Sequence, residues 1–187
     1  MNFPQLETER LGLVKIEEKH IQSYYEIMSK DEVTKFYGMN SLKNIEEATK
    51  IVDLFENTFN KSRGIRWGIL MKDLNRLIGT LGLNNLNTGS KKAEIGYELH
   101  PSFWGKGIAA EAITEVLEYS FQELDLFRIG AITFPDNVAS NKLLEKLGFT
   151  NEGLLRGYLY HNKPHDAFIY SLLKSEWGKN NKSWRTS

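Results

Sequence analysis

The segment at residues 101–112 carries the residue types and spacing that most directly suggest chemistry. It reads PSFWGKGIAAEA and places Gly105 and Gly107 directly before an apolar run of helical periodicity. The backbone N–H groups in the first turn of a helix have no partner within the helix, and with the helix dipole they attract anions. Glycine lets a phosphate approach the backbone closely. The segment therefore predicts a phosphate-binding loop. A loop that only turns the chain into a helix is the alternative.

Two well-known phosphate loops have related sequences, and neither fits. A P-loop needs Ser or Thr directly after the Lys of GxxxxGK[ST], whereas Gly107 follows Lys106. The dinucleotide pattern GxGxxG/A is matched by Gly105, Gly107 and Ala110, but that fold alternates parallel strands with helices. Here three strand-like runs joined by short turns precede the loop. We therefore interpret the loop as an anion site of a different fold.

A pair of acidic residues precedes this loop. Glu94 and Glu98 lie four residues apart in a strand-like run, and the alternation of a strand places both on one face. A carboxylate on that face can take a proton from an amine, directly or through water. Two solvated surface carboxylates are the alternative, and the residues by themselves leave both interpretations open.

Histidine and cysteine patterns indicate no metal site. The chain has four histidines and no cysteine, and no HxxH or HExxH spacing occurs. His100 is expected at a strand end, and His165 with Asp166 is expected to order a hairpin. The absence of cysteine also excludes disulfides and cysteine nucleophiles.

The elements that must position these residues follow from hydrophobic periodicity. Asn44, followed by Glu47, resembles a capping box at the start of a helix. The chain order is strand, two helices, three hairpin strands, helix, strand, helix and two strands, which predicts an α+β fold with a mixed sheet. The expected strands span residues 9–16, 65–72, 77–85, 91–99, 128–134, 153–160 and 166–174, and the expected helices span residues 17–30, 44–59, 108–124 and 137–147.

Composition narrows the function classes. The 187 residues include 24 basic and 24 acidic side chains, so the net charge of zero gives no field that would draw the protein to nucleic acid or to an anionic membrane. The first residues contain acids and no apolar signal-peptide core, and no run of about 18 apolar residues occurs. We expect one domain over residues 1–177, a polar tail over residues 178–187 and a cytoplasmic location.

Several sequence pieces together carry a family resemblance. AEIGYELHP, WGKGIAAEA and DNVASNKLLEKLGFTNEGLLR follow one another, with LETERLGLVKI near the start, IGTLGL in the middle and HDAFIYSLL near the end. Over residues 6–177 the chain resembles the GNAT superfamily of acetyl-CoA-dependent N-acetyltransferases, most closely the RimJ/RimL type. The resemblance implies a mixed, mostly antiparallel sheet of about seven strands, flanked by about four helices, with the middle strands splayed apart.

The resemblance also implies which residues bind acetyl-CoA. Backbone amides of residues 105–109 would hold the pyrophosphate, and the pantetheine arm would pair with the exposed edge of the strand that ends at Leu99. Trp104 stands where the family has Gln or Arg, which leaves the phosphate to backbone amides and to Lys106. The expected cofactor-binding residues are Leu99, Trp104, Gly105, Lys106, Gly107, Ile108, Ala109, Asn137 and Ser140.

For catalysis the resemblance implies Ser140, and the spacing of the acidic pair adds Glu94, which falls in the family's AEIGY pattern, and Glu98, which stands where an aromatic residue is more usual. Asn137 and Ser140 match the family's NxxS at a helix start, where Ser140 would face the sulfur, and simple capping of the helix is the alternative. Leu144 stands where many relatives have a general-acid tyrosine, which leaves Ser140 as the proton donor. Glu94 and Glu98 are the candidate bases.

The acceptor implied by the resemblance is the α-amine of a protein or peptide N-terminus. An α-amine has a pKa near 7.7–8.0, against about 10.4 for lysine, so it loses its proton more easily. A polyamine or an aminoglycoside is the alternative, since the acidic pair could attract a cation. A non-catalytic acyl-CoA sensor on the same fold is a second alternative, and a homodimer is a further option.

Overall fold

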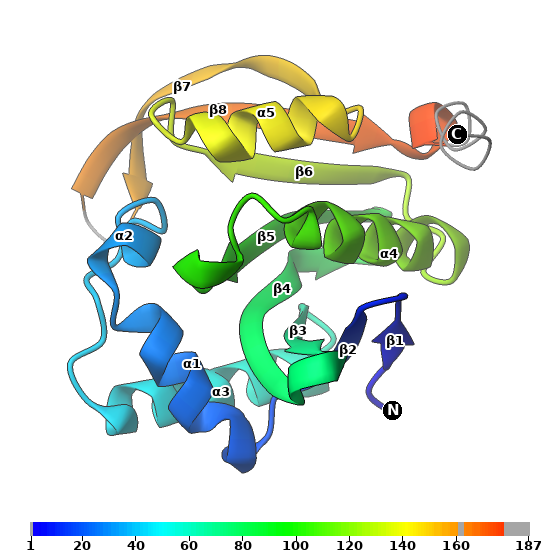
Figure 1. The fold of residues 1–187 in the computed structure, drawn as a ribbon. Helices are drawn as coiled ribbons and strands as arrows, with labels where there is room; N and C mark the ends of the chain where they lie inside the picture. Colours follow the sequence, from blue (N-terminus) through cyan, green and yellow to red (C-terminus); the bar gives the residue numbers. More distant parts are fainter. Residues whose placement is uncertain (1, 161–162, 178–187) are drawn as a thin grey trace.

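The computed structural model describes residues 2–160 and 163–177, drawn as a ribbon in Figure 1. The expected tail at residues 178–187 lies outside the described residues. An open sheet of eight strands occupies the centre. Its strands are β1 (Leu6–Glu7), β2 (Leu11–Lys15), β3 (Ile65–Met71), β4 (Arg76–Asn87), β5 (Lys92–Leu99), β6 (Arg128–Thr133), β7 (Thr150–Tyr160) and β8 (Lys163–Leu173). The helices are α1 (Ile21–Met28), α2 (Asp31–Thr34), α3 (Ile45–Asn60), α4 (Ile108–Gln122) and α5 (Val138–Lys146), with 3₁₀ turns η1 (Glu18–His20), η2 (Lys72–Leu74) and η3 (Pro101–Phe103).

The strand order confirms the predicted mixed, mostly antiparallel sheet. The order is β1-β2-β3-β4-β5-β6-β8-β7, and only β5 and β6 run parallel among these neighbours. The eighth strand, which was not expected, is β1. With two residues it is too short to show the alternation of apolar and polar residues that indicates a strand. Helix α2, with four residues, escapes prediction for the same reason.

The predicted splay lies between β5 and β6. The two strands pair at only three positions, which join Lys92, Ala93 and Glu94 to residues 128–130. Beyond Glu94, residues 95–99 of β5 stay paired with β4, while residues 131–133 of β6 stay paired with β8. The strands therefore separate because each keeps its other partner, and one edge of β5 is left without a strand.

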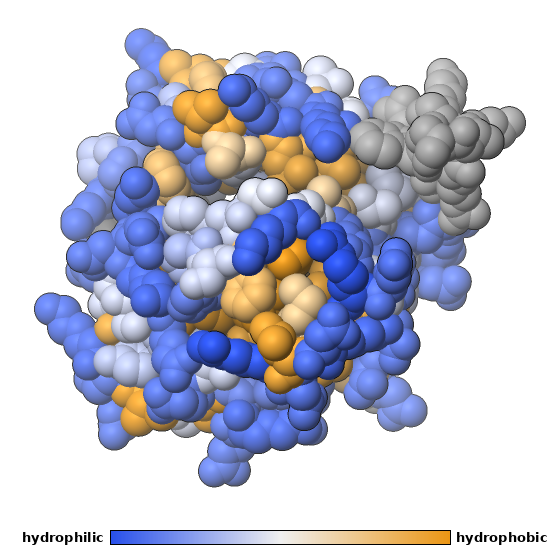
Figure 2. All heavy atoms as spheres, in the orientation of Figure 1, coloured by the Kyte–Doolittle hydropathy of each residue, from blue (hydrophilic) through white to orange (hydrophobic). Residues whose placement is uncertain are grey.

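Two hydrophobic clusters hold the helices against the sheet. Helix α4 packs its fully buried Ile113, Val116 and Phe121 against the face that carries Trp67 and Leu81. Helices α1 and α3 pack on the other face, in a separate cluster. Figure 1 shows α1 and α3 side by side, away from α4. On the face drawn in Figure 2, hydrophilic residues cover most of the surface, and hydrophobic residues are visible in recesses near its middle.

Local signals fix where the helices begin. The Asn44 side chain accepts a hydrogen bond from the Glu47 amide at 3.0 Å, as predicted, but the Glu47 carboxylate accepts from the Lys43 amide at 2.8 Å instead of that of Asn44. The capping box is thus displaced by one residue on one side. In the described residues no helix has both the length and the apolar character needed to cross a membrane.

The core beneath α4 should dominate stability. Phe121 is fully buried, so Phe121→Ala is expected to lower the free energy of unfolding by about 3–5 kcal/mol. Leu54 on α3 is 59% exposed, so Leu54→Ala serves as control and should change it by less than about 0.5 kcal/mol. Urea unfolding of both variants measures the difference. Equal decreases in the free energy of unfolding for the two variants would show that α4 is not packed as described.

Candidate functional site

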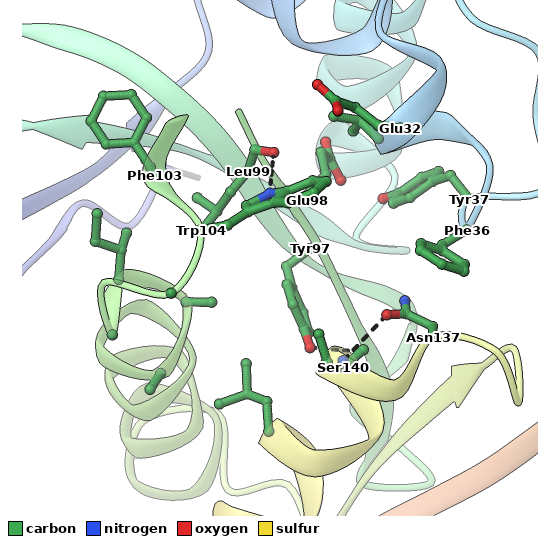
Figure 3. A pocket seen from close by; sticks show the side chains of 18 of the residues that line it. Glu32, Phe36, Tyr37, Tyr97, Glu98, Leu99, Phe103, Trp104, Asn137 and Ser140 are labelled. Carbon is green, nitrogen blue, oxygen red and sulfur yellow. Dashed lines mark hydrogen bonds between the residues drawn. The ribbon is translucent and has the colours of Figure 1, made fainter. Parts of the chain in front are cut away.

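A cavity of about 430 Å³ lies where β5 and β6 separate. Residues from α2, β5, the η3–α4 loop and α5 line it, and Figure 3 shows their side chains converging from these elements. The cavity therefore joins segments that are far apart in the sequence. The lining residues used below are Glu32, Phe36, Tyr37, Tyr97, Glu98, Leu99, Trp104, Gly105, Gly107, Ile108, Ala109, Asn137, Ser140 and Lys146.

The loop before α4 has the backbone geometry of an anion site. Gly105 and Gly107 have φ angles of 72° and 73°, in the left-handed region that glycine adopts without strain. The Trp104 amide donates to the Pro101 carbonyl, and the next hydrogen-bonded amide is that of Glu111. In the described residues the amides between these two have no backbone partner. No side chain caps α4 at Gly107, so these N–H groups are available to a ligand.

There is room for such a ligand beside the loop. A Cβ atom added at Gly105 would meet nothing within 4 Å, and one added at Gly107 would meet only an Arg10 nitrogen at 3.7 Å. The loop is thus open where a phosphate would approach the backbone. This space and the free amides fit the predicted pyrophosphate group.

Trp104 forms a structural hydrogen bond, whereas the Gln or Arg that it replaces would be a donor to the phosphate. Its indole Nε1 donates to the Leu99 carbonyl oxygen at 2.9 Å, which ties the loop to the end of β5. The ring remains 47% exposed and lines the cavity. Lys106 is not among the residues that line the cavity, and its ammonium lies 5.4 Å from the centre of the Phe103 ring. The structure therefore leaves the backbone amides as the main anion ligands in the loop.

The unpaired edge of β5 offers a second binding feature. Residues 95–99 pair with β4 on one side only, and residues 97–99 of this segment line the cavity. The N–H and C=O groups on their free side are therefore open to a ligand, except for the Leu99 carbonyl, which accepts from Trp104. An extended chain can pair with such an edge as an added strand would. Leu99 contributes through its backbone, because its side chain is buried.

A tyrosine that the sequence analysis missed lies at the centre of the site. The hydroxyl groups of Tyr97 and Ser140 are 2.7 Å apart and share a hydrogen bond (Figure 3). Burial raises the pKa of Tyr97 to about 12, although the bond to Ser140 acts in the opposite direction. The hydroxyl therefore keeps its proton at neutral pH. The sequence AEIGYEL contains this tyrosine, but only the separation of β5 from β6 shows that its side chain contacts α5.

Asn137 and Ser140 also have the helix-cap geometry of the alternative interpretation. The Asn137 side chain accepts from the Ser140 amide at 3.2 Å and so caps α5. Both residues nevertheless line the cavity. Capping places the Ser140 hydroxyl toward Tyr97 and does not compete with a role in binding.

Glu98 is a buried carboxylate with one free oxygen. Its side chain is 3% exposed, and the Thr80 hydroxyl donates to Oε1. The Arg66 Nη1 atom lies 3.7 Å from Oε2, and Oε2 has no hydrogen-bond partner in the described part of the chain. A buried polar atom without a partner is costly. Oε2 is covered by its neighbours, so a ligand in the cavity reaches it only after a small movement of the side chains around it.

Arg66 is buried behind Glu98 and was also missed by sequence analysis. Its guanidinium donates to the Gly96 carbonyl at 3.1 Å and to the Asn84 side chain at 3.2 Å. Burial opposes its charge, but nearby groups that include Glu98 raise its pKa overall. The only sequence signal is a charged residue inside the apolar run IRWGIL. Arg66 and Glu98 thus lie together as a buried pair of opposite charges.

The two predicted bases are separated by the structure. Glu94 lies where β5 still pairs with β6, outside the cavity lining, and Asn85 Nδ2 donates to its carboxylate at 3.0 Å. The strand alternation was right, but the splay begins only after Glu94. Of the two carboxylates, only Glu98 reaches the cavity.

Aromatic residues complete the side opposite the loop. Phe36 and Tyr37 line the cavity with Glu32, as Figure 3 shows. Burial raises the pKa of the Tyr37 hydroxyl well above its ordinary value, so it stays protonated. Within residues 2–160 and 163–177 no three His, Cys, Asp or Glu side chains group closely enough to hold a metal ion.

Comparison with known sequences gives a consistent set of relatives. Residues 10–150 match the model of the acetyltransferase (GNAT) domain. The chain is 45% identical over 173 residues to the N-acetyltransferase YoaA of Bacillus subtilis, covering 92% of this chain and 98% of that protein. It is 27% identical over 162 residues to the ribosomal-protein-serine acetyltransferase of Escherichia coli, covering 85% and 89%.

Solved structures share the same fold. RimJ of Mycobacterium smegmatis in complex with CoA-disulfide superposes with a TM-score of 0.82 at 23% identity, covering 94% of this chain and 90% of that one. Spermidine N-acetyltransferase of Vibrio cholerae in complex with CoA and spermine superposes with a TM-score of 0.79 at 22% identity, covering 91% and 99%. At these identities the similarity concerns the fold.

Proposed function

Since the chain belongs to the GNAT family of acetyltransferases, we propose that it acetylates the α-amine at the N-terminus of a protein or peptide. It is an acetyl-CoA-dependent N-acetyltransferase with RimJ/RimL-like relatives, as the sequence predicted. One observation carries the proposal for its chemistry: a single cavity joins an amide-rich loop, a hydroxyl pair and a buried carboxylate with a free oxygen.

The residues present fit acetyl-CoA as co-substrate. The free amides of residues 105–109 suit a pyrophosphate, and the unpaired edge of β5 suits a pantetheine arm, with Asn137 near its path. When bound, acetyl-CoA supplies the activated acetyl group as a thioester. These elements hold and orient it, and orientation by itself accounts for much of the rate of a two-substrate transfer.

Tyr97 and Ser140 would assist the departing sulfur. Their hydroxyls are linked at 2.7 Å, so one of them can donate outward while the other supports it. A Tyr97 hydroxyl with a pKa of about 12 donates a hydrogen bond far more readily than it gives up its proton. The pair therefore takes the place of the tyrosine that Leu144 replaces on α5.

Glu98 would act on the acceptor amine. Amines attack only without their extra proton, and Oε2 can accept that proton directly or through one water. Thr80 and Arg66 hold the carboxylate, and a small movement of the side chains that cover Oε2 would open this oxygen to the amine. Glu94 has no part in this proposal because it lies outside the cavity.

Charge around the cavity favours an α-amine over a polyamine. The lining contains two carboxylates, Glu32 and Glu98, but Arg66 already faces Glu98 and Lys146 also lines the space. A polycation therefore gains little net attraction there. The Escherichia coli relative is named for acetylating ribosomal-protein serine, whereas the Vibrio cholerae neighbour binds spermine. The polyamine acceptor is thus the second candidate.

Release of CoA with a panel of acceptors tests the proposed acceptor. Peptides with a free N-terminus should be acetylated, and the same peptides with a blocked N-terminus and an internal lysine should not. Turnover of polyamines or aminoglycosides only would overturn the proposal. Binding of acetyl-CoA without turnover of any amine would favour a sensor.

The loop can be tested by filling its open space. Gly107→Val should abolish CoA binding, because a branched side chain would occupy the anion's place. Gly157 on β7 has a φ of 63°, and a Cβ added there would meet nothing within 4 Å, so Gly157→Val carries a similar backbone strain away from the loop. Calorimetry should show wild-type affinity for the control. Equal losses would mean that strain, and not the filled space, removes binding.

Replacing the buried carboxylate should remove the base and spare the cofactor. Glu98→Gln should lower kcat by about 10²-fold or more and leave the CoA dissociation constant within about twofold, which also shows that the protein is folded. Glu94→Gln, four residues away on the same strand, is the matched control and should retain wild-type kcat. Loss of activity in the Glu94 variant only would reverse the assignment.

A double-mutant cycle tests whether the two hydroxyls act together. Tyr97→Phe and Ser140→Ala should each lower kcat by about 10- to 100-fold, and the double variant should lose no more than the larger single loss. Such non-additivity is expected when two groups work as a unit. Losses that multiply would assign them separate roles, and unchanged turnover would return Ser140 to a helix cap.

A further inference from the structure

A cluster of polar residues lies beside the phosphate loop, outside the cavity. It joins the turn between β1 and β2 to the first turn of α4. The Glu111 carboxylate accepts from the Arg10 amide at 3.0 Å, from Arg10 Nε at 2.6 Å and from the Thr8 hydroxyl. Three donors from one turn therefore hold a single carboxylate, across about a hundred residues of sequence.

The same arginine also holds the loop. Arg10 Nη1 donates to the Lys106 carbonyl oxygen at 3.1 Å, and its other terminal nitrogen lies 3.7 Å from the place of a Cβ on Gly107. In a trans peptide the C=O and N–H bonds point in opposite directions. Fixing the Lys106 carbonyl toward Arg10 therefore turns the Gly107 N–H away from Arg10, toward the open side of the loop.

The charge of Glu111 has two opposite effects at this position. A carboxylate in the first turn of α4 stabilises the helix but repels an anion bound at the same terminus. Burial tends to raise the pKa of Glu111, but the hydrogen bonds from Thr8 and Arg10 outweigh it, so the pKa is lowered and the group stays ionised. A negative charge kept beside an anion site needs a structural reason.

We propose that Arg10 and Glu111 are positioning residues for the pyrophosphate. Glu111 holds the Arg10 guanidinium, and Arg10 in turn holds the Lys106–Gly107 peptide so that its N–H faces the ligand. This inference rests on the proposed use of the loop for acetyl-CoA. It gives the turn at residues 8–10 a role in cofactor affinity, although no residue of that turn lines the cavity.

Glu111→Gln distinguishes a positioning role from a purely electrostatic effect, because the two predict opposite changes in the affinity for CoA. Removing a negative charge near an anion site should tighten CoA binding if charge is all that matters. If Glu111 positions the loop, the new amide NH₂ faces Arg10 Nε, the bond is lost and CoA should bind at least tenfold more weakly. Calorimetry with CoA measures the dissociation constant. Equal or tighter binding overturns the proposal.

Arg10→Gln provides the second test, with two substrates. S-acetylpantetheine has the same thioester without the pyrophosphate, so its kcat/KM should stay within about twofold of wild type, while that of acetyl-CoA falls at least tenfold. Arg76→Gln is the matched control, since Arg76 is similarly exposed and paired with Glu26 on another part of the surface. It should leave both values unchanged.

The outcomes distinguish the two proposals. Equal losses with both substrates in Arg10→Gln would indicate a general defect of folding and overturn the positioning role. Wild-type affinity in both variants would overturn it as well, with the proposed function intact. Failure of the wild-type protein to bind CoA would instead overturn the proposed function.

Discussion

The pairing of β5 is the constraint on which the rest of the structure depends. This strand bonds β4 along its length but bonds β6 at three positions only, because β6 diverges to stay with β8. In most sheets an interior strand has two bonded edges and offers nothing to a ligand. Here residues 95–99 lie inside the sheet with one edge free, and the cavity is the space that the divergence opens.

Side chains from both faces of β5 line this cavity, because the cavity lies along the edge of the strand. Tyr97 and Glu98 are neighbours that point to opposite faces, yet both line the same space. The first reaches Ser140 on α5, and the second is held by Thr80 and Arg66. Two chemically different groups, a protonated hydroxyl and a buried carboxylate, are thereby placed around one cavity.

Sequence signals predicted what depends on local patterns. The two glycines before an apolar run located the loop, and alternation located most strands, because these features reflect backbone geometry and burial. The missed features depend on long-range pairing. The point at which β5 stops pairing with β6 determines that Glu98 lines the cavity and Glu94 does not. This point cannot be inferred from a local sequence pattern. Arg66 and Tyr97 likewise acquire their partners only when distant segments meet.

Amide hydrogen exchange of β5 tests the central claim most directly. In an antiparallel pair the amides of one strand alternate in direction, so those of residues 95–99 that do not face β4 should exchange quickly in the free protein. Saturating acetyl-CoA should slow these amides together with those of residues 105–109, and should leave residues 92–94 unchanged. Protection confined to other segments, with none on this edge of β5, would contradict the account.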